Sequence, residues 1–133
     1  MGRRVGILAI QGDVLAHAKA LARVGAEARP VRHAADLAGL DALILPGGES
    51  TTISNGLLRL GLYEPLQAFA AEGRPILGTC AGAVLLAREV ENHPVQSLAL
   101  LDVVAVRNAY GTQVDSFAAM ADDSKLGELR CVF

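Results

Sequence analysis

The chain has 133 residues, a formal net charge of −2 and 52% hydrophobic residues, which suits one domain with a hydrophobic core and excludes an intrinsically disordered protein. Its charges are scattered, without the basic patch of a nucleic-acid-binding protein, and no apolar run approaches the roughly 18 residues of a membrane span. We therefore expect a single cytoplasmic domain over residues 1–133 that binds neither nucleic acid nor a membrane.

The N-terminal part of the chain predicts a strand followed by a helix. Residues 5–10 form a continuous apolar run, which is typical of a strand covered on both faces. Asp13 can cap the helix that follows, and Gly25 closes it. The apolar stripe of this helix consists of Val14, Ala18, Leu21 and Ala22.

The same alternation continues along the chain. Further strands are predicted at 27–31, 41–45 and 76–77, and helices at 35–40, from 50 or 51 to 60, at 64–72, and after Cys80 to about residue 89. Beyond them we expect a loop at 91–96, a strand-rich stretch at 98–107, an irregular or hairpin segment at 108–116 and an extended end. This order predicts an α/β fold with a mostly parallel, doubly wound (flavodoxin-like) sheet and helices on both faces.

Ligands of such sheets bind at the carboxyl ends of the strands, where the connecting loops meet. Three loops are expected to converge there: Gln11-Gly12, residues 46–52 and residues 78–82. The last of these, Gly78-Thr79-Cys80-Ala81-Gly82, places a cysteine between glycines at a strand-to-helix turn. Small neighbours permit a sharp turn with an exposed nucleophile at its apex, and the start of a helix favours a thiolate.

The other cysteine and the glycine pair Gly47-Gly48 have simpler explanations. Cys131 lies in an apolar stretch and is expected to be a small buried side chain. With no Cys-x-x-Cys or His-x-x-x-His pair, we expect no metal site. We also expect no cofactor. Gly47-Gly48 by itself predicts a turn and Ser50-Thr51-Thr52 a helix cap. Beside a nucleophile, however, a backbone N–H from the glycines and that of Ala81 can form an oxyanion hole.

Several motifs together resemble the glutaminase subunit of pyridoxal 5'-phosphate synthase, in the class I glutamine amidotransferase family. They occur in the family's order and cover nearly the whole chain. They are Gln11-Gly12, Leu45-Pro46-Gly47-Gly48-Glu49-Ser50-Thr51-Thr52, Gly78-Thr79-Cys80-Ala81-Gly82, Arg107-Asn108, Tyr110-Gly111 and Gln113-Val114-Asp115-Ser116-Phe117.

The resemblance implies hydrolysis of L-glutamine to glutamate and ammonia through a cysteine thioester. It implies a partner synthase subunit that uses the ammonia to make pyridoxal 5'-phosphate. Cys80 corresponds to the nucleophile, and Gly48 and Ala81 to the oxyanion donors. Gly48, Glu49, Ser50 and Arg107 match positions that contact glutamine.

One part of the family pattern is missing. The family takes its general base from a His-Pro-Glu segment near its C-terminus, and this chain has only His17, His33 and His93. His17, within the first helix, is expected at the surface or at an interface. None of the three histidines fits the pattern, so we expect the 133-residue chain to be weakly active or inactive. It is either a truncated copy, which its apolar ending favours, or a natural short form that has lost turnover.

Two other functions remain possible on the sequence. One is a related flavodoxin-like cysteine hydrolase or deglycase, which would carry an acidic residue after the first strand where this chain has Gln11. The other is a catalytically inactive domain that docks on a synthase. The intact Cys80 and Gly47-Gly48 favour the enzyme, and the missing base favours the docking domain.

Overall fold

Four parallel strands form the central sheet of the computed structural model, which describes residues 2–133. The strands are β1 (Arg4–Leu8), β2 (Glu27–Val31), β3 (Ala42–Leu45) and β4 (Ile76–Gly78). Their order across the sheet is β2-β1-β3-β4, so the chain crosses over β1 and then winds in the opposite direction. The predicted α/β fold with a parallel, doubly wound sheet is confirmed.

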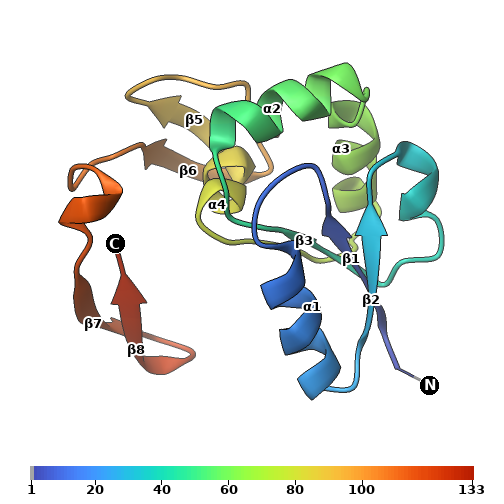
Figure 1. Cartoon of the computed structure of the whole chain (residues 1–133), viewed down its shortest axis with the longest axis horizontal. Coiled ribbons are helices and arrows are strands. Elements are labelled where there is room, and N and C mark those ends of the chain that lie inside the picture. Colours follow the sequence, from blue (N-terminus) through green and yellow to red (C-terminus); the bar gives the residue numbers. More distant parts are fainter. Residues whose placement is uncertain (1) are drawn as a thin grey trace.

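Helices cover both faces of this sheet (Figure 1). Helix α1 (Val14–Arg23) packs on the face formed by Val5, Ile7 and Ile44. The opposite face is covered by α2 (Ser50–Arg59), α3 (Tyr63–Ala71) and α4 (Ala81–Leu86), together with the 3₁₀ helix η1 (Ala34–Leu37). Side chains that alternate along β1 and β3 therefore enter two different hydrophobic clusters, because successive residues of a strand point to opposite faces.

The C-terminal half adds two small sheets beside this core. Strand β5 (Ala87–Glu91) pairs in parallel with β6 (Leu101–Val106), and β7 (Ala118–Asp123) forms an antiparallel hairpin with β8 (Gly127–Val132). The 3₁₀ helix η2 (Gln113–Asp115) connects them, and the hairpin lies to one side of the sheet (Figure 1). None of the helices in residues 2–133 has the length and apolar character needed to cross a bilayer.

The structure differs from the sequence-based prediction at several element ends. The helix after Cys80 ends at Leu86 rather than near residue 89, because the chain from Ala87 onward pairs with β6. The first strand ends at Leu8, two residues early, and the short helix after β2 is a 3₁₀ turn. Asp13 precedes α1 but its side chain makes no capping hydrogen bond.

Candidate functional site

The three loops that follow β1, β3 and β4 meet at the carboxyl edge of the sheet, as predicted. The Asp13 N–H donates to the Gly47 carbonyl at 3.1 Å, and the Glu49 N–H donates to Oε1 of Gln11 at 2.9 Å. The loop after β4 is tied to β3 by the Thr79 N–H, which donates to the Leu45 carbonyl at 3.0 Å. These bonds fix loops that are far apart in sequence against one another.

Cys80 lies at the apex of the turn between β4 and α4. Its φ of 51° and ψ of −116° are unusual for a residue with a side chain, and the thiol is exposed. Such a backbone conformation persists only where its surroundings hold it. The Gly82 N–H donates to the Thr79 carbonyl at 2.8 Å across the turn, and a Cβ on Gly82 would lie 1.9 Å from the Leu45 carbonyl oxygen. The turn is therefore a nucleophile elbow whose shape requires small residues.

An open cavity of about 1000 Å³ lies above Cys80. Its lining includes the predicted site residues Gly48 and Glu49 together with residues 108–112, which follow β6. The full lining is Gln11, Gly12, Asp13, Gly47, Gly48, Glu49, Cys80, Val106, Asn108, Ala109, Tyr110, Gly111, Thr112, Ser116, Val132 and Phe133. Two of these lining residues, Tyr110 and Phe133, belong to an aromatic cluster with Phe117, in which ring centroids lie 5.2–5.4 Å apart.

Two backbone amides near the cavity are candidates for oxyanion stabilisation. The Gly47 carbonyl accepts the Asp13 N–H, and the peptide is trans, so the Gly48 N–H points away from Asp13. A Cβ on Gly47 would lie only 3.1 Å from Cβ of Cys80, which brings this peptide against the nucleophile. Ala81 is the first residue of α4, where an N–H has no acceptor within its own helix.

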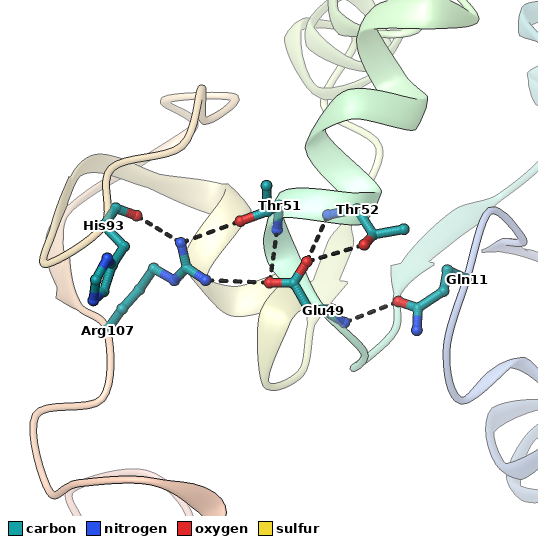
Figure 2. A network of polar contacts seen from close by, with 6 residues as sticks. All are labelled: Gln11, Glu49, Thr51, Thr52, His93 and Arg107. Atoms are coloured by element: carbon teal, nitrogen blue, oxygen red, sulfur yellow. Dashed lines mark hydrogen bonds and ion pairs between the residues drawn. The ribbon is translucent and has the colours of Figure 1, made fainter.

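Glu49 and Arg107 form the centre of a polar network beside the cavity (Figure 2). The Arg107 guanidinium donates to Oε1 of Glu49 at 3.2 Å, to the His93 carbonyl at 2.6 Å and to the Thr51 hydroxyl at 3.4 Å. Only 15% of the Arg107 side chain is exposed, although it does not line the cavity. The turn after β6 thus places the Arg107 guanidinium at the N-terminus of α2.

The Glu49 carboxylate also caps α2. It accepts the N–H groups of Thr51 and Thr52 at 3.2 and 2.8 Å and the Thr52 hydroxyl at 3.0 Å. These contacts hold the pKa of Glu49 below its usual value. The Thr52 N–H contributes most, burial opposes it as the second-largest effect, and the Thr51 N–H, the Thr52 hydroxyl and the charge of Arg107 lower the pKa further. Glu49 is therefore a carboxylate at neutral pH.

The remaining predicted residues lie around this centre. Ser50 is the first residue of α2 and is 5% exposed, while Ala81 directly follows Cys80. Neither lines the cavity, so the structure brings Cys80, Gly48 and Glu49 into one space, whereas Ser50, Ala81 and Arg107 are not among the residues that line it. Cys131, expected to be buried, is partly exposed in β8.

The three histidines lie outside the cavity. His33 is exposed near Asp36, and His93 is exposed and contributes only its carbonyl to Arg107. His17 was expected at the surface or at an interface, yet its Nε2 lies 3.0 Å from Oγ1 of Thr79, next to Cys80. His17 lies one turn into the helix that begins at the sheet's carboxyl edge. This position in the sequence could have indicated that His17 lies close to the nucleophile turn. Within residues 2–133, no three His, Cys, Asp or Glu side chains are grouped so as to hold a metal ion.

Comparison with known proteins gives consistent matches. Residues 7–133 match the model of the SNO glutamine amidotransferase family. A pyridoxal 5'-phosphate synthase subunit PdxT of Listeria monocytogenes (serotype 4a, strain HCC23) is 52% identical over 88% of this chain and 62% of that protein. A protein of the same description from Frankia casuarinae is 56% identical over 89% of this chain and 60% of its own length.

Two solved structures resemble this fold. One, described as a glutamine amidotransferase, has a TM-score of 0.87 and 44% identity over 97% of this chain and 69% of its own. A putative peptidase E protein from Listeria monocytogenes EGD-e, at 20% identity and a TM-score of 0.66, shares the fold alone. The chain spans between 60% and 66% of the length of the curated relatives compared with it.

Proposed function

Because this chain belongs to the SNO glutamine amidotransferase family, we propose that it hydrolyses L-glutamine to glutamate and ammonia with Cys80 as the nucleophile. The observation that carries this proposal is the strained, exposed Cys80 at the elbow after β4, in one cavity with Gly48 and Glu49. We take residues 1–133 as one glutamine amidotransferase-like domain.

The reaction proceeds by acyl transfer to sulfur. The Cys80 thiolate attacks the side-chain amide carbon, and the carbonyl oxygen becomes an oxyanion that the Gly48 and Ala81 N–H groups stabilise. The amide nitrogen takes up the proton that the thiol lost, the C–N bond breaks and ammonia leaves. Water then attacks the glutamyl thioester, which gives glutamate and returns its proton to the Cys80 sulfur. The Gly48 donor is preorganised, since the carbonyl of its peptide, that of Gly47, already accepts the Asp13 N–H.

Glutamine is held by its amino acid end. Glu49 offers a carboxylate to the substrate's ammonium group, and Arg107 offers a guanidinium to its α-carboxylate. Ser50, which directly follows Glu49, is the third side chain of this substrate-binding set. Arg107 is already paired with Glu49, so a bound α-carboxylate competes with, or adds to, that ion pair.

We infer a synthase subunit as the partner that receives the ammonia, for pyridoxal 5'-phosphate synthesis in the cytoplasm. The printed description of the PdxT relatives as subunits of pyridoxal 5'-phosphate synthase supports this inference. Because no histidine of residues 2–133 lines the cavity with Cys80, we expect turnover by the 133-residue chain to be weak or absent. Binding and covalent capture of a glutamine analogue are therefore better tests than turnover.

A chloroketone analogue of L-glutamine provides that test, with the label located by mass spectrometry. We expect alkylation of Cys80 that free L-glutamine slows and L-asparagine does not, and that Cys80→Ser abolishes. Cys131→Ser is the matched control, because it removes the other thiol and leaves the labelling rate unchanged. An unprotected Cys80 that reacts no faster than a free thiol would instead support a docking domain without catalysis.

A further inference from the structure

A hydrogen bond between the side chains of His17 and Thr79 joins α1 to the nucleophile turn, residues 78–82. It is the only side-chain hydrogen bond between these two segments in the described residues 2–133. His17 Nε2 and Thr79 Oγ1 lie 3.0 Å apart, and both side chains are partly buried. The two residues are 62 positions apart in sequence. Helix α1 lies on the opposite face of the sheet from α4 (Figure 1), so this bond links α1 to the turn that precedes α4.

Thr79 is the residue through which the turn can be held. Its N–H donates to the Leu45 carbonyl at 3.0 Å, and its carbonyl accepts the Gly82 N–H at 2.8 Å. Its hydroxyl forms a third hydrogen bond, with the imidazole of His17. Cys80 follows directly with its φ of 51°, a conformation that relaxes unless neighbouring residues fix it.

We propose that His17 is a positioning residue, which holds Thr79 so that the Cys80 thiol keeps its orientation toward the oxyanion donors. This inference rests on the function proposed above. His17 does not line the cavity and contacts Thr79 rather than the thiol, so it acts through the turn and takes no proton from the substrate or the nucleophile.

The test compares two alkylating reagents on the 133-residue chain carrying Cys131→Ser. Iodoacetamide reports simple thiol reactivity, and the glutamine chloroketone reports reactivity at a correctly oriented thiol. The variants are His17→Ala, His17→Gln, whose carboxamide can replace the imidazole bond, and Thr79→Val, which removes the hydroxyl and keeps the shape. Lys19→Ala, at an exposed position of the same helix, is the matched control.

We expect His17→Ala and Thr79→Val to lower the chloroketone-to-iodoacetamide rate ratio by roughly three- to tenfold, the size expected for one neutral hydrogen bond. His17→Gln should recover most of the ratio, and Lys19→Ala should leave it unchanged. The double variant should be no worse than either single variant, because both remove the same bond. An unchanged ratio in His17→Ala, or effects of the two single variants that multiply, would overturn the proposal.

Hydrogen exchange separates failure of this inference from failure of the proposed function. If the parent chain shows no preference for the glutamine chloroketone, the function fails, and the amides of Thr79 and Gly82 still report on His17. We expect them to exchange roughly three- to tenfold faster in His17→Ala than in Lys19→Ala. Equal exchange in the two variants would show that His17 does not hold the turn.

Discussion

The Glu49 carboxylate stabilises the fold at the same place where it is proposed to bind substrate. It caps α2 through Thr51 and Thr52, and it pairs with Arg107, which directly follows β6. The sequence suggested Ser50-Thr51-Thr52 as the cap, because serine and threonine are the usual capping residues. The structure instead places Glu49 at the N-cap position, so one carboxylate both caps the N-terminus of α2 and pairs with the Arg107 guanidinium (Figure 2).

Acid should destabilise the protein partly through Glu49. Its pKa is lowered in the folded state by the N–H of Thr52, then by the other Thr contacts and Arg107. A carboxyl group whose folded pKa is depressed contributes stability that is full above its unfolded value, near 4.5, and is lost as the pH falls through the folded pKa. The side chain is half exposed, so solvent screening keeps this contribution small.

We therefore predict that Glu49→Gln lowers the free energy of unfolding at pH 7 by about 1 kcal/mol and flattens its dependence on pH below 4.5. Urea unfolding at pH 7.0 and between pH 3 and 5 measures both effects. Glu64→Gln, at an exposed position in the first turn of α3, is the control. A pH dependence in Glu49→Gln as steep as in the parent chain would contradict the assignment.

At Gly82, helix α4 lies so close to the sheet that no side chain would fit between them. A Cβ on Gly82 would lie 1.9 Å from the Leu45 carbonyl oxygen, and one on Gly78 would lie 2.6 Å from the Gly82 carbonyl oxygen. These contacts involve backbone, which cannot rotate away as a side chain can. The close approach sets the short turn that exposes Cys80.

Gly82→Ala should therefore disrupt both the elbow and the packing of α4. We expect a loss of about 3 kcal/mol in the free energy of unfolding, together with loss of analogue labelling at Cys80. Ala83→Ser, at an exposed position of the same helix, should change stability by less than about 0.5 kcal/mol. Chemical denaturation and mass spectrometry measure the two effects, and a Gly82→Ala protein with parent stability would refute the packing argument.

The end of α4 shows where local pattern stops being informative. The sequence after Cys80 predicts a helix to about residue 89, yet β5 begins at Ala87. Its partner β6 begins at Leu101 and supplies parallel backbone hydrogen bonds, and Arg88 pairs with Asp102 across the two strands. Pairing with a distant strand overrides helix propensity, which amounts to only a few tenths of a kcal/mol per residue.

The molecule as a whole divides into a well-buried sheet and a more exposed C-terminal hairpin. Val31, Leu45 and Leu57 are fully buried, whereas every described side chain of β7 and β8 is at least partly exposed. Backbone bonds between Phe117 and Phe133 close the hairpin at 3.1 and 2.9 Å, and their rings stack with a centroid distance of 5.2 Å. A two-stranded hairpin with so little buried surface has little stability of its own.

We predict that the amides of β7 and β8 exchange with solvent at least roughly tenfold faster than those of β1 and β3. Phe133→Ala should speed exchange in the hairpin further, because it removes the stacked ring, and leave the central sheet unchanged. Native-state hydrogen exchange read by mass spectrometry gives both rates. Exchange in β7 and β8 as slow as in β1 would show that the hairpin and the sheet open as one unit.

The sequence by itself determined the α/β order, the three converging loops and Cys80 at their meeting point. Apolar runs, glycine breaks and a cysteine between small residues are local features, and parallel strands bring their carboxyl ends together. Only the tertiary structure decided that Glu49 caps α2 and pairs with Arg107, that α4 ends at Leu86, and that His17 reaches Thr79. The Arg107 and Thr79 contacts and the β5–β6 pairing join residues far apart in the chain, and no local periodicity reports such contacts. The cap of α2 is local, but Ser50, Thr51 and Thr52 offer competing capping side chains, and the sequence pattern does not choose among them.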